Sequence, residues 1–374
     1  MNNEVYYIGF NANNAICNEN FFSGSITLYP TGEKGNICFS DKLLPDSTSK
    51  AFLEKYKTFI YNNCKQIQKM NFNANFICFN EKATNLCSSM KDINIVKGNN
   101  SNIIKFLNNK FKSREFVKSI IPILDYSFDD SESLCYDSIS EKTSSSKFVI
   151  QEANGAGGDT TYLIDSNNTL SNVKKENCTY CVSKYINNIP LNITLIIGDK
   201  SICYLPMSAQ LIKVINNRFK YVGADFKFTS ELTKYTIDTI YKYSESIANM
   251  VKSTGYRGIL GIDYVLDENE KIYFMEFNPR FQSSSFLISR KLEEIKLPNI
   301  ANLHYQAIMG NCIPEITDFT IGESFLNCNV NQQFNNILNY EIVNNGYFSQ
   351  NPSSFYRKVL KRSIIHEDNF EKIK

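Results

Sequence analysis

The sequence contains only two histidines, His304 and His366, among its 374 residues, and neither stands in a recognisable catalytic motif. Mechanisms that pair a serine or cysteine nucleophile with histidine, and phosphohistidine relays, therefore find no support. Long apolar runs are also missing, since none approaches the ~20 residues that a membrane span requires. Residues 1–10 lack a basic start followed by a long apolar stretch, so we expect no signal peptide and no membrane partner.

Positive and negative residues are nearly balanced, and the net charge is only +2. Such a balance does not indicate a surface for nucleic acid or acidic lipids. The 11 cysteines are odd in number and scattered, which favours reduced thiols in the cytoplasm over a disulfide framework. Cys178 and Cys181 form the one CxxC sequence, but no second pair or nearby histidine completes a zinc site. We interpret them as partly buried strand cysteines.

The distribution of apolar residues predicts an α/β protein. In the first hundred residues, short runs rich in branched and aromatic side chains alternate with a helical pattern, which favours a partly parallel sheet. A polar break at residues 99–101 precedes a helical stretch that divides near Lys110. Residues 129–146 are either a loop or a helix of weak periodicity. Strands are expected at 5–10, 25–29, 75–79, 93–96, 147–151, 161–164, 180–186, 193–198, 201–206, 210–214, 260–267 and 271–277, with helices at 49–70, 103–120 and 230–254.

The pair of strands at residues 260–277 carries the most distinctive chemistry. Asp263 lies on the first strand, whereas Glu276 and Asn278 lie on the second and point to the same face, because side chains two residues apart share one face of a strand. Arg280 follows in the same phase. Carboxylate and amide oxygens together suit Mg²⁺, and the guanidinium suits phosphate oxygens. By spacing alone, an ordinary hairpin with a solvated polar face explains the pattern equally well.

A glycine-rich segment, residues 155–161, connects two of the predicted strands. Backbone N–H groups in such a segment can approach phosphate oxygens, and its tip can close as a flap. The GxxxxGK[ST] sequence of P-loops is absent, and no GxGxxG sequence opens a helix here. A plain turn is the simpler interpretation when the segment is considered by itself.

In this order the elements resemble the ATP-grasp superfamily over residues 100–290. The resemblance implies a Rossmann-like N-terminal domain at 1–100, a small lobe with the flap at 101–186, and a large lobe with the metal hairpin and a C-terminal extension at 187–374. It implies that the protein binds ATP together with Mg²⁺ or Mn²⁺. Asp263, Glu276 and Asn278 would be the metal ligands. Arg280 would act in catalysis. The nucleotide-binding residues implied are Lys110, Gln151, Gly155, Gly157, Gly158, Thr160, Lys184, Tyr185 and Ile186.

Two positions depart from the family pattern. Gln151 stands where the strand before the flap usually carries a lysine, so this strand supplies a hydrogen-bond donor without a charge. Lys147 or Lys213 is a candidate to compensate. Ser183 replaces the acidic residue that usually contacts adenine or ribose. Arg257, Gln210, Arg218 and Arg290 are candidate substrate contacts, although surface or structural roles account for each of them more simply.

The activity implied is ADP-forming ligation of a small carboxylate to an amine through an acyl phosphate. Amino acids and peptides are the substrates we expect, and a homodimer is neither indicated nor excluded. A biotin-dependent carboxylase shares this chemistry, but the missing lysine and Ser283, Ser284 and Ser285 count against it. A nucleotide-binding pseudoenzyme or regulatory protein is the alternative that Gln151 and Ser183 favour. A scaffold or interaction protein that binds no nucleotide is a third alternative.

Overall fold

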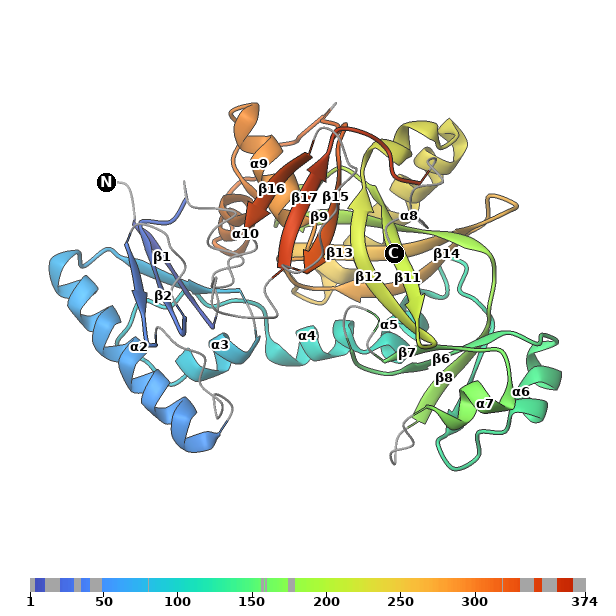
Figure 1. The fold of residues 1–374 in the computed structure, drawn as a ribbon. Coiled ribbons are helices and arrows are strands. Elements are labelled where there is room, and N and C mark those ends of the chain that lie inside the picture. The colour runs from blue at the N-terminus through green and yellow to red at the C-terminus, as the bar shows by residue number, and fades with distance from the viewer. Residues whose placement is uncertain are drawn as a thin grey trace.

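The structure is a computed structural model, and it describes residues 4–10, 21–29, 35–40, 49–79, 81–155, 158, 160–173, 179–317, 319–329, 340–344 and 355–365 (Figure 1). The described strands form two sheets, one of four strands and one of thirteen. No helix among the described residues has both the length and the apolar character needed to cross a membrane.

The first sheet is parallel, with the order β3-β2-β1-β4. Residues of β1 are buried on both sides, as expected for a parallel strand covered on two faces. Helix α2 packs on one face through Tyr56 and Ile60, and the Tyr56 hydroxyl donates to the Gly9 carbonyl at 2.6 Å. The elements of this part are β1 (Val5–Gly9), β2 (Gly24–Thr27), β3 (Asn36–Cys38), α2 (Lys50–Met70), β4 (Asn75–Cys78) and α3 (Glu81–Cys87).

A small lobe follows, built from an antiparallel arrangement in which β6 lies between β7 and β8. Two short helices precede it, and their junction falls at Asn109, whose side chain caps the second helix by accepting from the N–H groups of Phe111 and Lys112. The elements are α4 (Ser101–Asn108), α5 (Lys110–Val117), β5 (Tyr126–Asp130), α6 (Tyr136–Thr143), β6 (Phe148–Glu152), β7 (Thr161–Ile164), α7 (Asn167–Ser171) and β8 (Thr179–Lys184).

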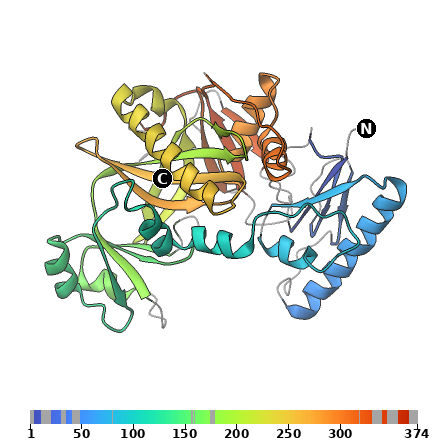
Figure 2. The ribbon, with the colours of Figure 1, turned by 180° about the vertical axis from the view of Figure 1, so that it is seen from behind.

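The large lobe centres on long antiparallel strands, with β13 between β9 and β14. Helix α8 covers this sheet through Ile240, Ile247 and Val251, which share a core with Leu195 and Leu260 (Figure 2). The elements are β9 (Asn188–Ile197), β10 (Ile202–Tyr204), β11 (Ser208–Ile215), β12 (Arg218–Asp225), the 3-10 helix η1 (Lys227–Glu231), α8 (Lys234–Ser253), β13 (Gly258–Asp267), β14 (Ile272–Asn278), α9 (Ser285–Glu294) and α10 (Ile300–Ile308).

Three further strands, β15 (Ser324–Asn329), β16 (Tyr340–Asn344) and β17 (Phe355–Leu360), extend the large sheet beyond β12. The buried Asp225 carboxylate fastens this extension, because its two oxygens accept five hydrogen bonds of 2.5 to 3.1 Å. The donors are the hydroxyls of Ser324 and Ser363 and the backbone N–H groups of Phe228, Ile364 and Ile365.

The two sheets meet at a shared aromatic core. Phe79 follows β4 and stacks on Phe281 with ring centroids 4.2 Å apart, and His304 of α10 packs edge-on against both rings. Burial lowers the pKa of His304 to about 3, and its Nδ1 accepts from the Ile259 N–H at 3.0 Å. This histidine is therefore a neutral structural residue. The core places the end of the first sheet directly beside the hairpin that bears Glu276 and Arg280.

Most sequence predictions of secondary structure are confirmed, including the division of the 103–120 stretch near Lys110. The predicted helix start at residue 230 is wrong, because Ser230 lies in η1 and the Thr233 side chain caps α8, which begins at Lys234. Strand β12 was not predicted. Residues 93–96 form only an isolated bridge between Ile95 and Phe76, and residues 129–146 contain α6.

Candidate active site

The candidate site is centred on the β13–β14 hairpin. Asp263 pairs directly opposite Glu276, and Gly261 pairs opposite Asn278, with an irregularity of register after Asp263. Phe277 lies between the two polar residues of β14 and points into the large-lobe core. The alternation of a strand therefore brings both carboxylates and the Asn278 amide to one place.

Asp263 is held by amide groups from three strands. Its Oδ1 accepts from the Asn192 side chain at 2.6 Å, and its Oδ2 accepts from the Asn278 side chain at 3.0 Å. Burial, followed by the charge of Glu276, raises the pKa of Asp263 to about 7, although hydrogen bonds from Asn192 and Gln210 act in the opposite direction. Asn192 is thus a part of the site that the sequence did not indicate, whereas Gln210, a candidate substrate contact in the sequence, lies beside Asp263.

Arg280 lies just beyond the end of β14 and folds back onto it. Its guanidinium donates to Asn278 Oδ1 at 2.8 Å, and its backbone N–H donates to the Asn278 carbonyl at 2.8 Å. Asn278 therefore bridges Arg280 to Asp263, donating on one side and accepting on the other. This arrangement fixes a cation beside the paired carboxylates.

Helix α5 adds two more cations to the site. Lys110 is 3% exposed, and its Nζ lies 3.4 Å from Glu276 Oε2. Arg114 follows one helical turn later, so it shares the inward face of α5 with Lys110. It is 5% exposed and donates to Gln151 Oε1 at 2.6 Å. The sequence signal for Arg114 is its spacing of four residues from Lys110, which places both side chains on one face of the helix.

Gln151 lies near the end of β6 and is buried. Its side-chain amide accepts from Arg114 and donates to Thr161 Oγ1 at 3.3 Å. Lys147 lies four residues earlier, where its carbonyl accepts from the Tyr185 N–H. Lys213 lies on β11, paired with Lys220 of β12.

The glycine-rich segment lies against the β11–β12 hairpin. Gly158 has φ +81°, and a Cβ there would stand 2.1 Å from the Phe219 carbonyl, so both the backbone conformation and the space require glycine. Gly155 has φ +147° and packs beside Thr160, whose hydroxyl donates to the Asn154 carbonyl at 3.0 Å. Gly157 falls outside the described residues.

The predicted adenine hinge begins at Lys184, the last residue of β8. Lys184 is exposed, and Tyr185 and Ile186 are partly buried. The Tyr185 N–H donates to the Lys147 carbonyl, which anchors the hinge to the start of β6. Ser183 is buried between β5 and β6, opposite Tyr126 and Val149.

The remaining arginines among the substrate candidates have local structural partners. Arg257 forms an ion pair with Asp199, and Arg290 lies 3.4 Å from Glu294 on the same helix. Arg218 stacks over the Tyr162 ring at 5.4 Å and forms the β12–β7 backbone pair that links the two lobes. Gln210, the fourth candidate, hydrogen-bonds to Asp263.

The oxygen donors at the hairpin fit a hard divalent cation. Within the described residues no three side chains of His, Cys, Asp or Glu gather at one point. A metal would therefore rest on Asp263, Glu276 and the Asn278 amide oxygen, completed by oxygens of a bound phosphate or water, which is the pattern Mg²⁺ prefers. Burial, and after it the charge of the adjacent Glu276, raises the pKa of Asp263, and a bound cation would relieve the repulsion between the two carboxylates.

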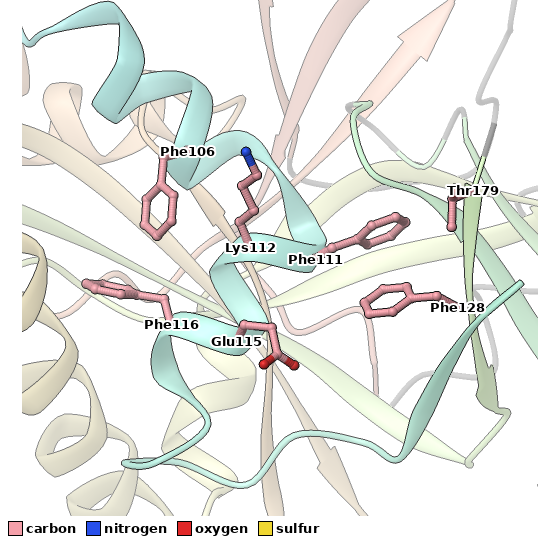
Figure 3. Close-up of a pocket in the computed structure, with 7 residues that line it drawn as sticks. All are labelled: Phe106, Phe111, Lys112, Glu115, Phe116, Phe128 and Thr179. Carbon is pink, nitrogen blue, oxygen red and sulfur yellow. The ribbon is translucent and has the colours of Figure 1, made fainter.

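A cavity of about 650 Å³ lies on the opposite face of α5 (Figure 3). Phe111 and Phe128 pack together at one end, with ring centroids 4.8 Å apart, and Phe106 and Phe116 line the other end. Because Lys110 and Arg114 point inward from α5, this cavity is separate from the carboxylate pair.

The comparisons with known proteins agree with this geometry. Residues 107–284 match the model of the ATP-grasp domain family. The chain carries an ATP-grasp domain. That domain contains Lys110, the glycine-rich segment and the whole hairpin from Asp263 to Arg280. No curated protein matches the sequence significantly.

Solved structures with a similar fold include a synthetase and biotin carboxylases with bound nucleotides. N5-carboxyaminoimidazole synthetase from Staphylococcus aureus, complexed with ADP, is 14% identical with a TM-score of 0.65, over 99% of this chain and 97% of that one. Biotin carboxylase from Campylobacter jejuni, complexed with β-γ-ATP, is 11% identical with a TM-score of 0.67, over 96% and 87%.

A third structure is the biotin carboxylase domain of the Hydrogenobacter thermophilus 2-oxoglutarate carboxylase, in complex with MgADP, ADP and bicarbonate. It is 14% identical with a TM-score of 0.63, over 96% of this chain and 86% of that one. These similarities extend beyond residues 107–284 and cover the first sheet. The predicted α/β ATP-grasp fold is therefore confirmed.

Proposed function

We propose that this protein is an ATP-dependent ligase that activates a small carboxylate as an acyl phosphate and transfers the acyl group to an amine. The observation that carries the proposal is the convergence of Lys110 with the carboxylates of Asp263 and Glu276. These groups come from α5 and from the hairpin, which lie more than 150 residues apart in sequence yet meet at one point. The ATP-grasp domain supplies the reaction class to which this geometry is suited.

In the proposed reaction an oxygen of the substrate carboxylate attacks the γ-phosphorus of ATP. The bond from that phosphorus to the bridging oxygen breaks, and ADP leaves with both electrons. The amine then attacks the acyl carbonyl, phosphate leaves, and the amine loses its proton to solvent or to a nearby carboxylate. No covalent intermediate on the protein is needed, which is consistent with the scarcity of histidine.

The protein's part in this reaction is positioning and charge stabilisation. Asp263, Glu276 and Asn278 would hold Mg²⁺, or Mn²⁺ in its place, and the cation would neutralise charge on the phosphates. Arg280 would stabilise the phosphoryl group in transfer, and its hydrogen bond to Asn278 keeps it there. Lys110 would bind phosphate from the other side, and the glycine-rich segment would exclude water that hydrolyses acyl phosphates.

The nucleotide would lie between the small lobe and the hairpin, with its adenine at Lys184, Tyr185 and Ile186. Gln151, Gly155, Gly157, Gly158 and Thr160 would contact its phosphates. We propose three domains: a Rossmann-like domain at 1–100, a small lobe at 101–186, and a large lobe with its C-terminal extension at 187–374. The carboxylate and amine would bind beside the aromatic core in which Phe79 of the first part stacks on Phe281. Amino acids or a small peptide are the substrates we favour, and a cytoplasmic location suits such metabolites.

Bicarbonate is a second candidate for the acid substrate. One structural neighbour holds bicarbonate and MgADP, and others are described as carboxylating enzymes. With bicarbonate the same steps would give carboxyphosphate and then a carboxylated amine. The pseudoenzyme alternative keeps nucleotide binding but loses turnover, and Gln151 and Ser183 are the residues that favour it.

The test is ADP release from Mg·ATP with amino acids, dipeptides or bicarbonate, each combined with a panel of amines. Glu276→Ala is the variant, and Glu294→Ala, an exposed residue of α9, is the matched control. We expect turnover with one acid and amine pair, loss of turnover in Glu276→Ala, and wild-type turnover in Glu294→Ala. Full turnover by Glu276→Ala would refute the assignment of the site. Binding of Mg·ATP without ADP release on any pair would favour the pseudoenzyme.

A further inference from the structure

The neutral residue at the end of β6 leaves the phosphate end of the site short of one positive charge. Gln151 occupies the position where the ATP-grasp pattern usually has a lysine. Its side chain is buried, with 8% of its surface exposed, so no solvated lysine can replace that charge from outside. Lys110, which is also buried, occupies the other lysine position, so a second buried cation beside β6 would restore the charge that Gln151 lacks.

Arg114 is such a cation. Its guanidinium reaches three separate elements of the site: it donates to Gln151 Oε1 on β6 at 2.6 Å, to Cys181 Sγ on β8 at 2.9 Å, and to the Met275 carbonyl on β14 at 3.2 Å. Met275 is the neighbour of Glu276, so the guanidinium lies between the small-lobe sheet and the metal hairpin. It is 5% exposed.

The partners of Arg114 are all neutral. They are an amide oxygen, a thiol and a backbone carbonyl, and no carboxylate among the described residues forms an ion pair with it. Burying a guanidinium without a counter-charge is unfavourable, because its hydration is lost and nothing compensates for the charge. A bound anion would supply the missing partner, and a planar guanidinium is well matched to phosphate oxygens.

We propose that Arg114 supplies the positive charge that position 151 lacks, and that it positions Gln151 toward the nucleotide polyphosphate. The contact with Arg114 occupies the amide oxygen of Gln151, so the amide nitrogen is directed away from the cation. That nitrogen donates to Thr161 Oγ1 at 3.3 Å and has a second hydrogen for a phosphate oxygen. The pair thus combines the charge of one residue with the donor of the other.

The inference rests on the proposed nucleotide binding, and calorimetric titration of Mg·ATP and of adenosine tests it without any need for turnover. Arg114→Gln should weaken Mg·ATP binding by about 10- to 100-fold, the range expected for a hydrogen bond to a charged group. Adenosine binding should change less than about twofold, because adenosine carries no phosphate. Arg114→Gln combined with Gln151→Lys should regain at least about tenfold of the lost affinity, since it returns the charge to β6.

The matched control is Lys112→Gln, which removes a cation from the outward face of the same helix and should leave both affinities unchanged. If Arg114→Gln does not fold, Arg114→Met replaces the guanidinium with an apolar chain of similar length in both the single and the double variant. Equal loss of adenosine and Mg·ATP affinity, or no regain in the double variant, would overturn the inference in favour of a purely structural arginine.

Failure of the inference and failure of the proposed function are separable. If the wild type binds Mg·ATP and Arg114→Gln binds it with the same affinity, only the role of Arg114 is refuted. Binding that follows the expected pattern without ADP formation would refute the ligase while the inference stands. Absence of Mg·ATP binding by the wild type would refute both.

Discussion

The pKa of Asp263 gives a test of the carboxylate pair that needs neither nucleotide nor substrate. Burial and the charge of Glu276 raise this pKa from 3.8 to about 7. The folded protein therefore holds a proton on Asp263 between about pH 4 and 7 that the unfolded chain has lost. The free energy of unfolding must then decrease as the pH rises through this window, by at most about 1.4 kcal/mol per pH unit, and level off above pH 7.

The measurement is chemical denaturation of the metal-free protein at a series of pH values, compared with Asp263→Asn. In the wild type, the Asp263 carboxyl group should lower the free energy of unfolding by about 2 to 3 kcal/mol between pH 5 and 8. This decrease should be missing in Asp263→Asn. Glu276→Gln removes the neighbouring like charge, so it should move the midpoint of the decline to lower pH. Parallel pH profiles for the wild type and Asp263→Asn would refute the reasoning.

Added Mg²⁺ extends the same experiment. A cation at this site competes with the proton on Asp263, so its stabilisation of the wild type should be small at pH 6 and larger at pH 8. Asp263→Asn should show almost no stabilisation by Mg²⁺ at either pH. A magnesium effect that is independent of pH would mean that the ion binds elsewhere.

Two further substitutions test other parts of the structure. Asp225→Ala should lower the free energy of unfolding, measured by denaturation, by about 3 to 5 kcal/mol, because it leaves buried donors without an acceptor. The control Asp238→Ala, on the exposed side of α8, should change this free energy by less than about 0.5 kcal/mol. Equal effects of the two substitutions would refute the role of Asp225. Gly158→Ala should raise the KM for ATP at least about tenfold while the fold is retained, because alanine is strained at φ +81° and its Cβ meets the Phe219 carbonyl. Gly98→Ala, which has open space around it, is the control, and an unchanged KM in Gly158→Ala would show that the flap tip does not close on β12.

Much of the fold could be predicted from local patterns. The shared face of Glu276 and Asn278 was predictable because a strand repeats every two residues, and the resemblance to the ATP-grasp superfamily joined Asp263 to them. Lys110 was identifiable from its place at a helix start before a glycine-rich loop. The helix start at Thr233 was missed because Ser230 and Thr233 are both suitable caps, and only the turn of η1 decides between them.

The rest of the site depends on contacts that no local pattern encodes. Asn192 donates to Asp263 across 71 residues of sequence, and Arg114 reaches Gln151 across 37 residues and Met275 across 161. Strand pairing and lobe packing create these contacts. A neutral Gln151 thus looked like a lost charge in the sequence, whereas the structure shows a cation supplied by a helix.

The central claim is that the β13–β14 hairpin binds the metal–phosphate end of Mg·ATP, and calorimetry on wild type and Glu276→Gln tests it most directly. With Mg²⁺ present, we predict that the substitution weakens ATP binding by more than about tenfold, in line with the loss of a charged ligand. With EDTA present, the two proteins should bind ATP with equal affinity, since no metal is there to be held. Equal affinities in the presence of Mg²⁺ would contradict the account.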